Sequence, residues 1–344
     1  MSAVKEHLFG ITLNCIHFKS YRHTRSWMLL GMVAMLGVHT SQAAITFNFN
    51  YTDTAGTGWY DTTYGQTRRD ALVYSANQLG QYFNATATIG YTVSSITDPD
   101  TNTLASAGSN AYGPLVPGFE PTIVQYKIQS GYSGSVSYTD GSIDWNFGKS
   151  WSYSYTPSGV SAGENDFVST AMHELLHSFG FISTIENNGT GALGKPIGDP
   201  DLWYTFDRYL TTSSGSSMID PITYAFDPAQ LGTLTGGVGA MRFNGTYATP
   251  TFTDGVPIYT PTTWSGGSSG SHTDDLTFNG STYPELMMNA ASGTGPGVRS
   301  LSSYEQGILK DIGYNVVPEP GCAMLCLAGS FAMCFFRRHR RGPA

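Results

Sequence analysis

The main body of this chain, residues 44–317, contains no cysteine, because all four cysteines lie in the terminal segments, at Cys15, Cys322, Cys326 and Cys334. The body therefore has neither a disulfide nor a thiol. It also lacks any internal repeat of solenoid length. Its 274 residues nevertheless suffice to bury a substantial hydrophobic core, either as one large domain or as two lobes.

Basic residues are also scarce in the body, which has nine Lys and Arg against 23 Asp and Glu, a net charge of −14. Such an acidic surface argues against nucleic-acid binding and favours solubility outside the cell. The charge does not identify a substrate. Ser, Thr and Gly are abundant, but the plentiful aromatic residues indicate an irregular, ordered protein rather than a disordered one.

Hydrophobic periodicity predicts an α+β fold that opens with a strand, a helix and a second strand. Residues 45–51 alternate apolar and polar side chains, residues 68–83 carry apolar side chains at helical spacing, and residues 87–96 return to strand character. Further strands are predicted at 122–128 and 143–147. This order indicates a twisted mixed sheet with a helix laid across it.

The second half of the body is predicted to contain fewer regular elements. The strongest helix prediction is 165–179, with an Asn-Asp pair near its start and a glycine just past its end. Residues 189–270 are rich in Gly, Ser, Thr and Pro, so we expect loops and short elements there rather than a second autonomous core. A final helix is predicted at 302–312, opened by a capping-box pair.

Histidine is scarce in the body too, and its placement points to a metal site. Only His173, His177 and His272 occur there, and the other five histidines lie in the terminal segments. The first two frame the run His-Glu-Leu-Leu-His at 173–177. A catalytic zinc ion typically takes three protein ligands and a water. The sparing use of histidine therefore predicts a zinc hydrolase.

The spacing within this run explains its chemistry. His173 and His177 are one helical turn apart, so both imidazoles can bind one metal ion. Glu174 is predicted to take a proton from a zinc-bound water, whose pKa zinc lowers toward ~7, and to return it to the leaving amine. The alternative is two surface histidines on an amphipathic helix.

The third zinc ligand is predicted from a family resemblance. The run HELLHSFG at 173–180 resembles the start of the metzincin signature, in which a third histidine follows the glycine by three residues. This chain has Ser183 there, and serine is a poor zinc ligand. Leishmanolysin-type metzincins carry a long insertion before the third histidine. His272, with 94 residues between it and His177, fits that arrangement.

Carboxylates provide the alternatives for the third ligand. Glu186, Asp199 and Asp207 could each complete a site that already has two histidines. Acidic turns at 98–102 and 199–201 could also hold calcium, but neither has the alternating oxygen-ligand spacing of a calcium loop. Turn formation is the expected role of these residues.

Two C-terminal stretches extend the resemblance. Glu285-Leu286-Met287 resembles the Met-turn, in which a methionine packs beneath the zinc site, although Met288 could take that place instead. Residues 301–314 (LSSYEQGILKDIGY) resemble the C-terminal helix and its end. One departure is that leishmanolysin-type enzymes are rich in disulfides. The resemblance implies a lobe of sheet and helices that carries the active-site helix, and a loop-rich lobe from about residue 181, with zinc on the floor of the cleft between them.

Both termini predict export. Residues 1–43 are basic, then apolar, and end in small residues, which predicts a signal peptide removed before Ala44. Residues 318–344 place Pro-Glu-Pro before an apolar stretch and an arginine cluster, an order that resembles the PEP-CTERM sorting signal of Gram-negative bacteria. That resemblance implies an exosortase-type processing enzyme as a partner, with the body at the cell surface or outside the cell. An ordinary C-terminal membrane anchor is the alternative.

The sequence as a whole therefore predicts a secreted zinc endopeptidase of the metzincin type that acts on proteins or peptides. One alternative is a non-catalytic zinc-containing protein that binds other components of the cell surface or extracellular matrix. A second alternative is a zinc hydrolase that acts on non-peptide amides.

Overall fold

The computed structural model describes residues 44–134, 139–250, 252 and 254–317, all of which belong to one unit of the chain. The predicted signal peptide and the predicted sorting signal lie outside these residues. None of the helices in the described ranges is long and apolar enough to cross a membrane.

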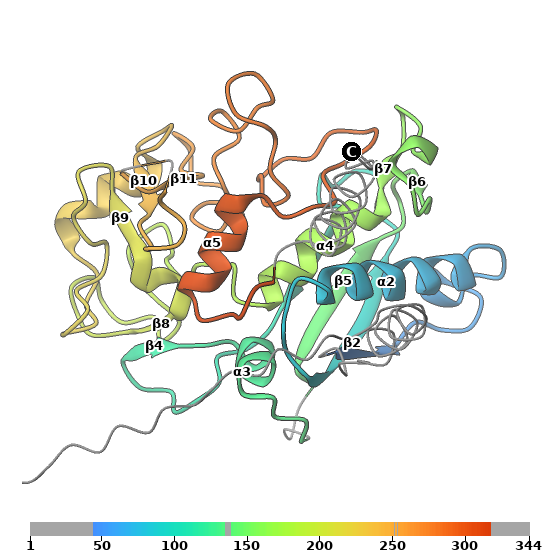
Figure 1. The fold of residues 1–344 in the computed structure, drawn as a ribbon, viewed down its shortest axis with the longest axis horizontal. Helices are drawn as coiled ribbons and strands as arrows, with labels where there is room; N and C mark the ends of the chain where they lie inside the picture. The colour runs from blue at the N-terminus through green and yellow to red at the C-terminus, as the bar shows by residue number, and fades with distance from the viewer. Residues whose placement is uncertain (1–43, 135–138, 251, 253, 318–344) are drawn as a thin grey trace, which may run out of the picture. The chain divides into compact units, whose positions relative to one another are not determined.

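A four-stranded mixed sheet forms the first half of the fold (Figure 1). The strands lie in the order β1 (Ile45–Tyr51), β2 (Ala87–Ile96), β5 (Gly141–Asn146) and β3 (Ala105–Gly108). The first three are parallel, whereas β3 pairs antiparallel with β5 and lies at the edge. The predicted mixed sheet is confirmed. The edge strand β3 was not predicted, because its sequence Ala-Ser-Ala-Gly contains none of the β-branched and aromatic residues typical of strands.

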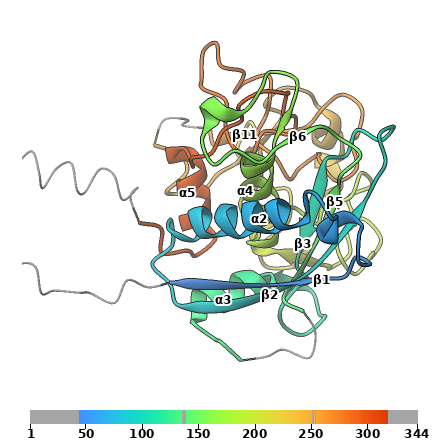
Figure 2. The same ribbon diagram turned by 90° about the vertical axis from the view of Figure 1, so that its right-hand side faces the viewer.

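Two helices pack on one face of this sheet. The helix α2 (Gly65–Gly80) lies across it and contacts α4 (Phe167–Ser178), which also contacts β3 (Figure 2). Alternate residues of β2 are buried, as expected for a strand with one covered face. The predicted helices at 68–83 and 165–179 are therefore present, with their ends displaced by a few residues.

The strand predicted at 122–128 is wrong, because these residues form the helix α3 (Ile123–Ser130). Its start is a capping box: the Thr122 hydroxyl accepts a hydrogen bond from the Gln125 amide, and the Gln125 side chain accepts one from the Thr122 amide. Gly131, at a φ of 70°, ends the helix. The two caps and the burial of residues three and four apart, such as Val124 and Ile128, favour the helix more than the β-branched residues favour a strand.

The remainder consists of short elements, as predicted for 189–270, and ends in the helix α5 (Ser303–Asp311). One three-stranded antiparallel sheet contains β9 (Leu210–Thr212), β10 (Met241–Phe243) and β11 (Val256–Ile258). The other elements are the strand pairs β4 (Gly118–Glu120) with β8 (Leu202–Tyr204) and β6 (Trp151–Ser152) with β7 (Asn165–Asp166), and the 3₁₀ helices η1 (Gly58–Tyr60), η2 (Pro157–Gly159), η3 (Thr205–Tyr209) and η4 (Pro228–Thr235).

Among the described residues, one hydrophobic core joins the two halves. Buried residues of the four-stranded sheet, such as Ile89, belong to the same cluster as Phe206, Met241 and Leu309 from the later elements. In the described part of the chain, the loop-rich region is therefore held by its packing against the rest of the body. A division into two lobes at about residue 181, with a cleft between them, stays a prediction.

Candidate metal centre

The helix α4 carries two of the predicted ligands and is anchored to the sheet at both ends. The Phe167 ring packs on Trp145 of β5 with 4.2 Å between centroids, and the Phe179 ring stacks on Phe47 of β1 at 6.3 Å. Gly180 ends the helix at a φ of 92°, where a side chain would collide with Gln125. These contacts fix the direction in which His173 and His177 project.

The N-terminus of α4 is held by a buried ion pair. The Asp166 carboxylate accepts a hydrogen bond from the Ser169 amide and so caps the helix. Arg299 binds the same carboxylate, with 2.7 Å between its Nη2 and Asp166 Oδ1. The pair therefore connects the segment just before residue 303 to the start of the helix that carries His173 and His177.

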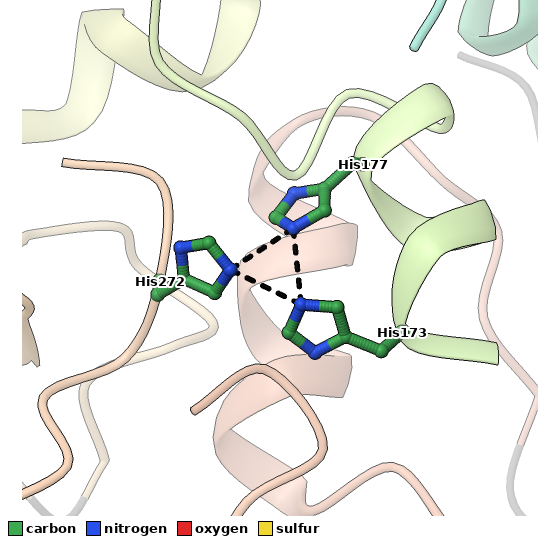
Figure 3. A group of neighbouring side chains, drawn as sticks. All are labelled: His173, His177 and His272. Carbon is green, nitrogen blue, oxygen red and sulfur yellow. Dashed lines mark hydrogen bonds between the residues drawn. The ribbon is translucent and has the colours of Figure 1, made fainter. Parts of the chain in front are cut away.

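Three histidines converge on one point (Figure 3). The Nε2 atoms of His173, His177 and His272 are each 3.1 Å from the other two. The first two come from consecutive turns of α4, and the third comes from a loop that follows β11. The structure thus brings together all three histidines of the body, although the loop histidine is 95 residues from the nearest helical one.

Each of these imidazoles is oriented by a backbone carbonyl. The Nδ1 of His173 lies 2.7 Å from the Met287 oxygen, and the Nδ1 atoms of His177 and His272 lie 2.8 Å from the oxygens of Phe181 and Ser268. A carbonyl oxygen can only accept, so Nδ1 carries the proton in all three rings. Nε2 of each neutral ring is then an unprotonated metal donor.

Burial also keeps the three rings neutral. It lowers the pKa of His173, and it lowers the pKa of His272 to about 3. Burial also lowers the pKa of His177 well below its usual range, and the nearness of the other two imidazoles, which disfavours a further positive charge, adds to this effect. Three neutral rings whose lone pairs meet at one point repel each other. A cation between them would remove that repulsion.

The donor set fits a metal ion of the zinc class. Two nitrogens that each lie ~2.0–2.1 Å from a tetrahedral ion are about 3.3 Å apart, close to the spacing of these Nε2 atoms. Three imidazoles leave a fourth position of such an ion open, as in catalytic zinc sites. Among the described residues, the three histidines are the one group of His, Cys, Asp and Glu close enough to hold a metal ion.

Glu174, the predicted general base, is next to the first histidine on α4. Only 9% of its surface is exposed. Burial raises the pKa of its carboxyl to about 8, and a hydrogen bond from the Ala107 backbone in β3 opposes this shift. The edge strand β3 therefore lies beside the predicted base, a neighbourhood that the sequence did not reveal.

The segment predicted as a Met-turn lies directly beside the first histidine. Met287 is buried, and its carbonyl orients His173 as described above. The Met288 amide donates a hydrogen bond to Glu305 of α5, at 2.8 Å between N and Oε1. From sequence, Glu305 is predicted only as the partner of Ser302 in the capping box at the start of the helix at 302–312. Its contact across to the turn had no local signal.

The carboxylates considered as third ligands are not part of the histidine group. Glu186 and Asp199 are exposed, and the fully buried Asp207 accepts hydrogen bonds from the amides of Thr184 and Tyr204. In the two acidic turns considered for calcium, carboxylates likewise accept hydrogen bonds from the backbone. Their carboxylates accept backbone amides at Asp98 (from residues 100 and 101) and at Asp201 (from residues 191, 193, 195 and 202).

No protein-family model, curated protein or solved structure matches this chain.

Proposed function

We propose that this protein is a zinc-dependent hydrolase that cleaves peptide bonds. The observation that carries the proposal is the convergence of three Nε2 atoms whose rings are each fixed by a backbone carbonyl, with Glu174 beside the first ring. Three imidazoles and an adjacent carboxylate are the set found in catalytic zinc sites, whereas a closed structural site uses four protein ligands.

When bound, zinc would act as a Lewis acid and lower the pKa of a water molecule toward ~7. The protein's own contribution is the transfer of a proton. Glu174 takes it from the attacking water and returns it to the leaving nitrogen of the cleaved amide. Glu174 must be ionised to accept the first proton, and the positive charge of a bound zinc ion would lower the carboxyl pKa that burial alone raises.

The resemblance to leishmanolysin-type metzincins supports a peptide substrate. The HELLHSFG run, His272 after a long insertion and Met287 beside His173 are the matching features. We further propose, from the terminal sequences alone, that the body is exported and that an exosortase-type enzyme processes its C-terminal tail. These steps would place the peptidase at the surface of a Gram-negative cell or outside it.

The test compares casein hydrolysis by the wild type and by Glu174→Gln, with zinc content measured in both. We expect the variant to keep its zinc and to lose activity by a factor of about 10²–10⁴, the usual contribution of a general base. Equal hydrolysis by both proteins would favour a non-catalytic zinc-containing surface protein. Zinc binding without casein cleavage in the wild type would redirect the search to non-peptide amides.

A further inference from the structure

The segment that follows α4 touches both parts of the chain that carry histidines. The Phe181 carbonyl accepts the hydrogen bond from His177. Two residues later, the Ser183 amide donates a hydrogen bond to the Ser271 hydroxyl, with 3.1 Å between N and Oγ. Ser271 directly precedes His272, so this one bond links the short loop after α4 to the third histidine.

The two loops approach each other closely at this bond. Ser271 is 4% exposed. Gly270 adopts a φ of 79°, and a Cβ atom built on it would lie 3.5 Å from both Cβ and Oγ of Ser183. On its other side the histidine loop pairs with Tyr259, whose amide donates to the His272 carbonyl at 2.8 Å. The backbone of His272 is therefore held between two neighbours.

The donor of the linking bond is itself immobilised. The next residue, Thr184, donates hydrogen bonds from its amide and its hydroxyl to the Asp207 carboxylate, at 3.0 and 2.7 Å. Asp207 is fully buried and also accepts the Tyr204 amide. These bonds fix the Ser183 amide relative to α4. Its hydrogen bond to Ser271 therefore also fixes the position of the His272 loop relative to α4.

We propose that Ser271 is a positioning residue for the third metal ligand, through the hydrogen bond that its hydroxyl accepts from Ser183. The proposal rests on the metal site proposed above. A histidine at the end of a 94-residue insertion has more conformational freedom to lose than one placed three residues after the helix. Ser183 lies three residues after Gly180, where a metzincin has its third histidine. Its amide holds the loop that carries His272, and it does not itself bind the ion.

The test measures the affinity of the full protein for Co²⁺, by competition with a chelator, and the visible absorption spectrum of bound Co²⁺. We expect Ser271→Ala to weaken binding by about tenfold or more, the usual cost of losing a contact that orients a ligand, and to alter the spectrum. Ser269→Ala is the matched control. It is also 4% exposed, and its hydroxyl accepts the Ser265 amide inside the same loop at 3.0 Å.

Two further variants separate positioning from stability. Ser271→Thr keeps the accepting hydroxyl. Ser271→Val has almost the same shape as the threonine variant but no hydroxyl, so of these two only the valine variant should bind Co²⁺ weakly. Equal affinity in the wild type, Ser271→Ala and Ser271→Val would overturn the proposal, as would an equal loss in Ser269→Ala. If the wild type itself bound no Co²⁺ or Zn²⁺, the metal site and this inference would both be wrong.

Discussion

At the scale of single residues, the candidate site depends on hydrogen bonds that point inward to one centre. Each histidine uses Nδ1 for a carbonyl and leaves Nε2 free of a proton, and this arrangement would be unfavourable without a cation. The tautomers are therefore set by backbone groups from three separate segments. None of these carbonyls could be identified from sequence, because any residue type supplies the same oxygen.

The assignment of the third ligand leads to a prediction about metal content. His272→Ala should lose stoichiometric zinc, because two imidazoles alone leave the ion without its third protein ligand. Glu186→Ala and Asp199→Ala should keep it, since both carboxylates are exposed and outside the histidine group. Zinc analysis of the purified variants is the measurement. Loss of zinc in either acidic variant, with retention in His272→Ala, would move the third ligand to that carboxylate.

Asp207 leads to a prediction about pH. Burial raises its pKa to about 6 in the folded protein, so the folded state holds this proton more tightly than the unfolded chain does. The stability that the carboxyl contributes is therefore full at low pH and is lost as pH rises toward 6. Denaturant unfolding from pH 4 to pH 7 should show the wild type losing stability relative to Asp207→Asn. A difference that is constant across this range would contradict the raised pKa.

At the scale of secondary-structure elements, α4 was predictable because apolar periodicity, an acidic cap and a terminal glycine all agreed. The helix α3 was not predictable from apolar periodicity, since its Ile and Val residues favour a strand; the Thr122–Gln125 capping box is its local helix signal. The edge strand β3 consists of four small residues and pairs with the distant strand β5. Its position beside Glu174 could not be predicted from sequence for the same reason.

The cap of α3 has a measurable role in stability. The Thr122 hydroxyl accepts the Gln125 amide and also donates to the Ser178 carbonyl at the end of α4, at 2.7 Å. Thr122→Ala should therefore lower the free energy of unfolding by about 1–2 kcal/mol, as the loss of a helix cap usually does. Thr62→Ala, at an exposed position, is the control. Equal stability of the two variants in denaturant unfolding would show that the cap contributes nothing.

At the scale of the whole molecule, one core connects the mixed sheet to a long region of loops and short strands. Sequence composition predicted the short elements at 189–270 but not how they fold back toward α4. That return depends on pairings between distant segments, such as β9 with β10 and Thr273 with Asn289. The scarcity of histidine in the body and the resemblance to metzincins, rather than any periodicity, pointed to His272.

A bound ion should stabilise this arrangement, because it would join α4 to a loop almost a hundred residues away. Binding to the folded state alone adds about 2.7 kcal/mol at a free metal concentration 100 times the dissociation constant. We therefore expect chelation to lower the midpoint of thermal unfolding of the wild type and to leave that of His272→Ala almost unchanged. Calorimetry with and without chelator measures both. An equal decrease in the two proteins would show that the stabilising ion binds elsewhere.

The most direct test of the central claim is the zinc content of the purified protein, combined with X-ray absorption at the zinc edge to identify the ligands. The three histidines predict one zinc ion per chain, bound by three imidazole nitrogens and one oxygen ligand such as water. A protein that binds no zinc after equilibration with the ion, or a spectrum with fewer than three imidazoles, would contradict the proposed site and the function built on it.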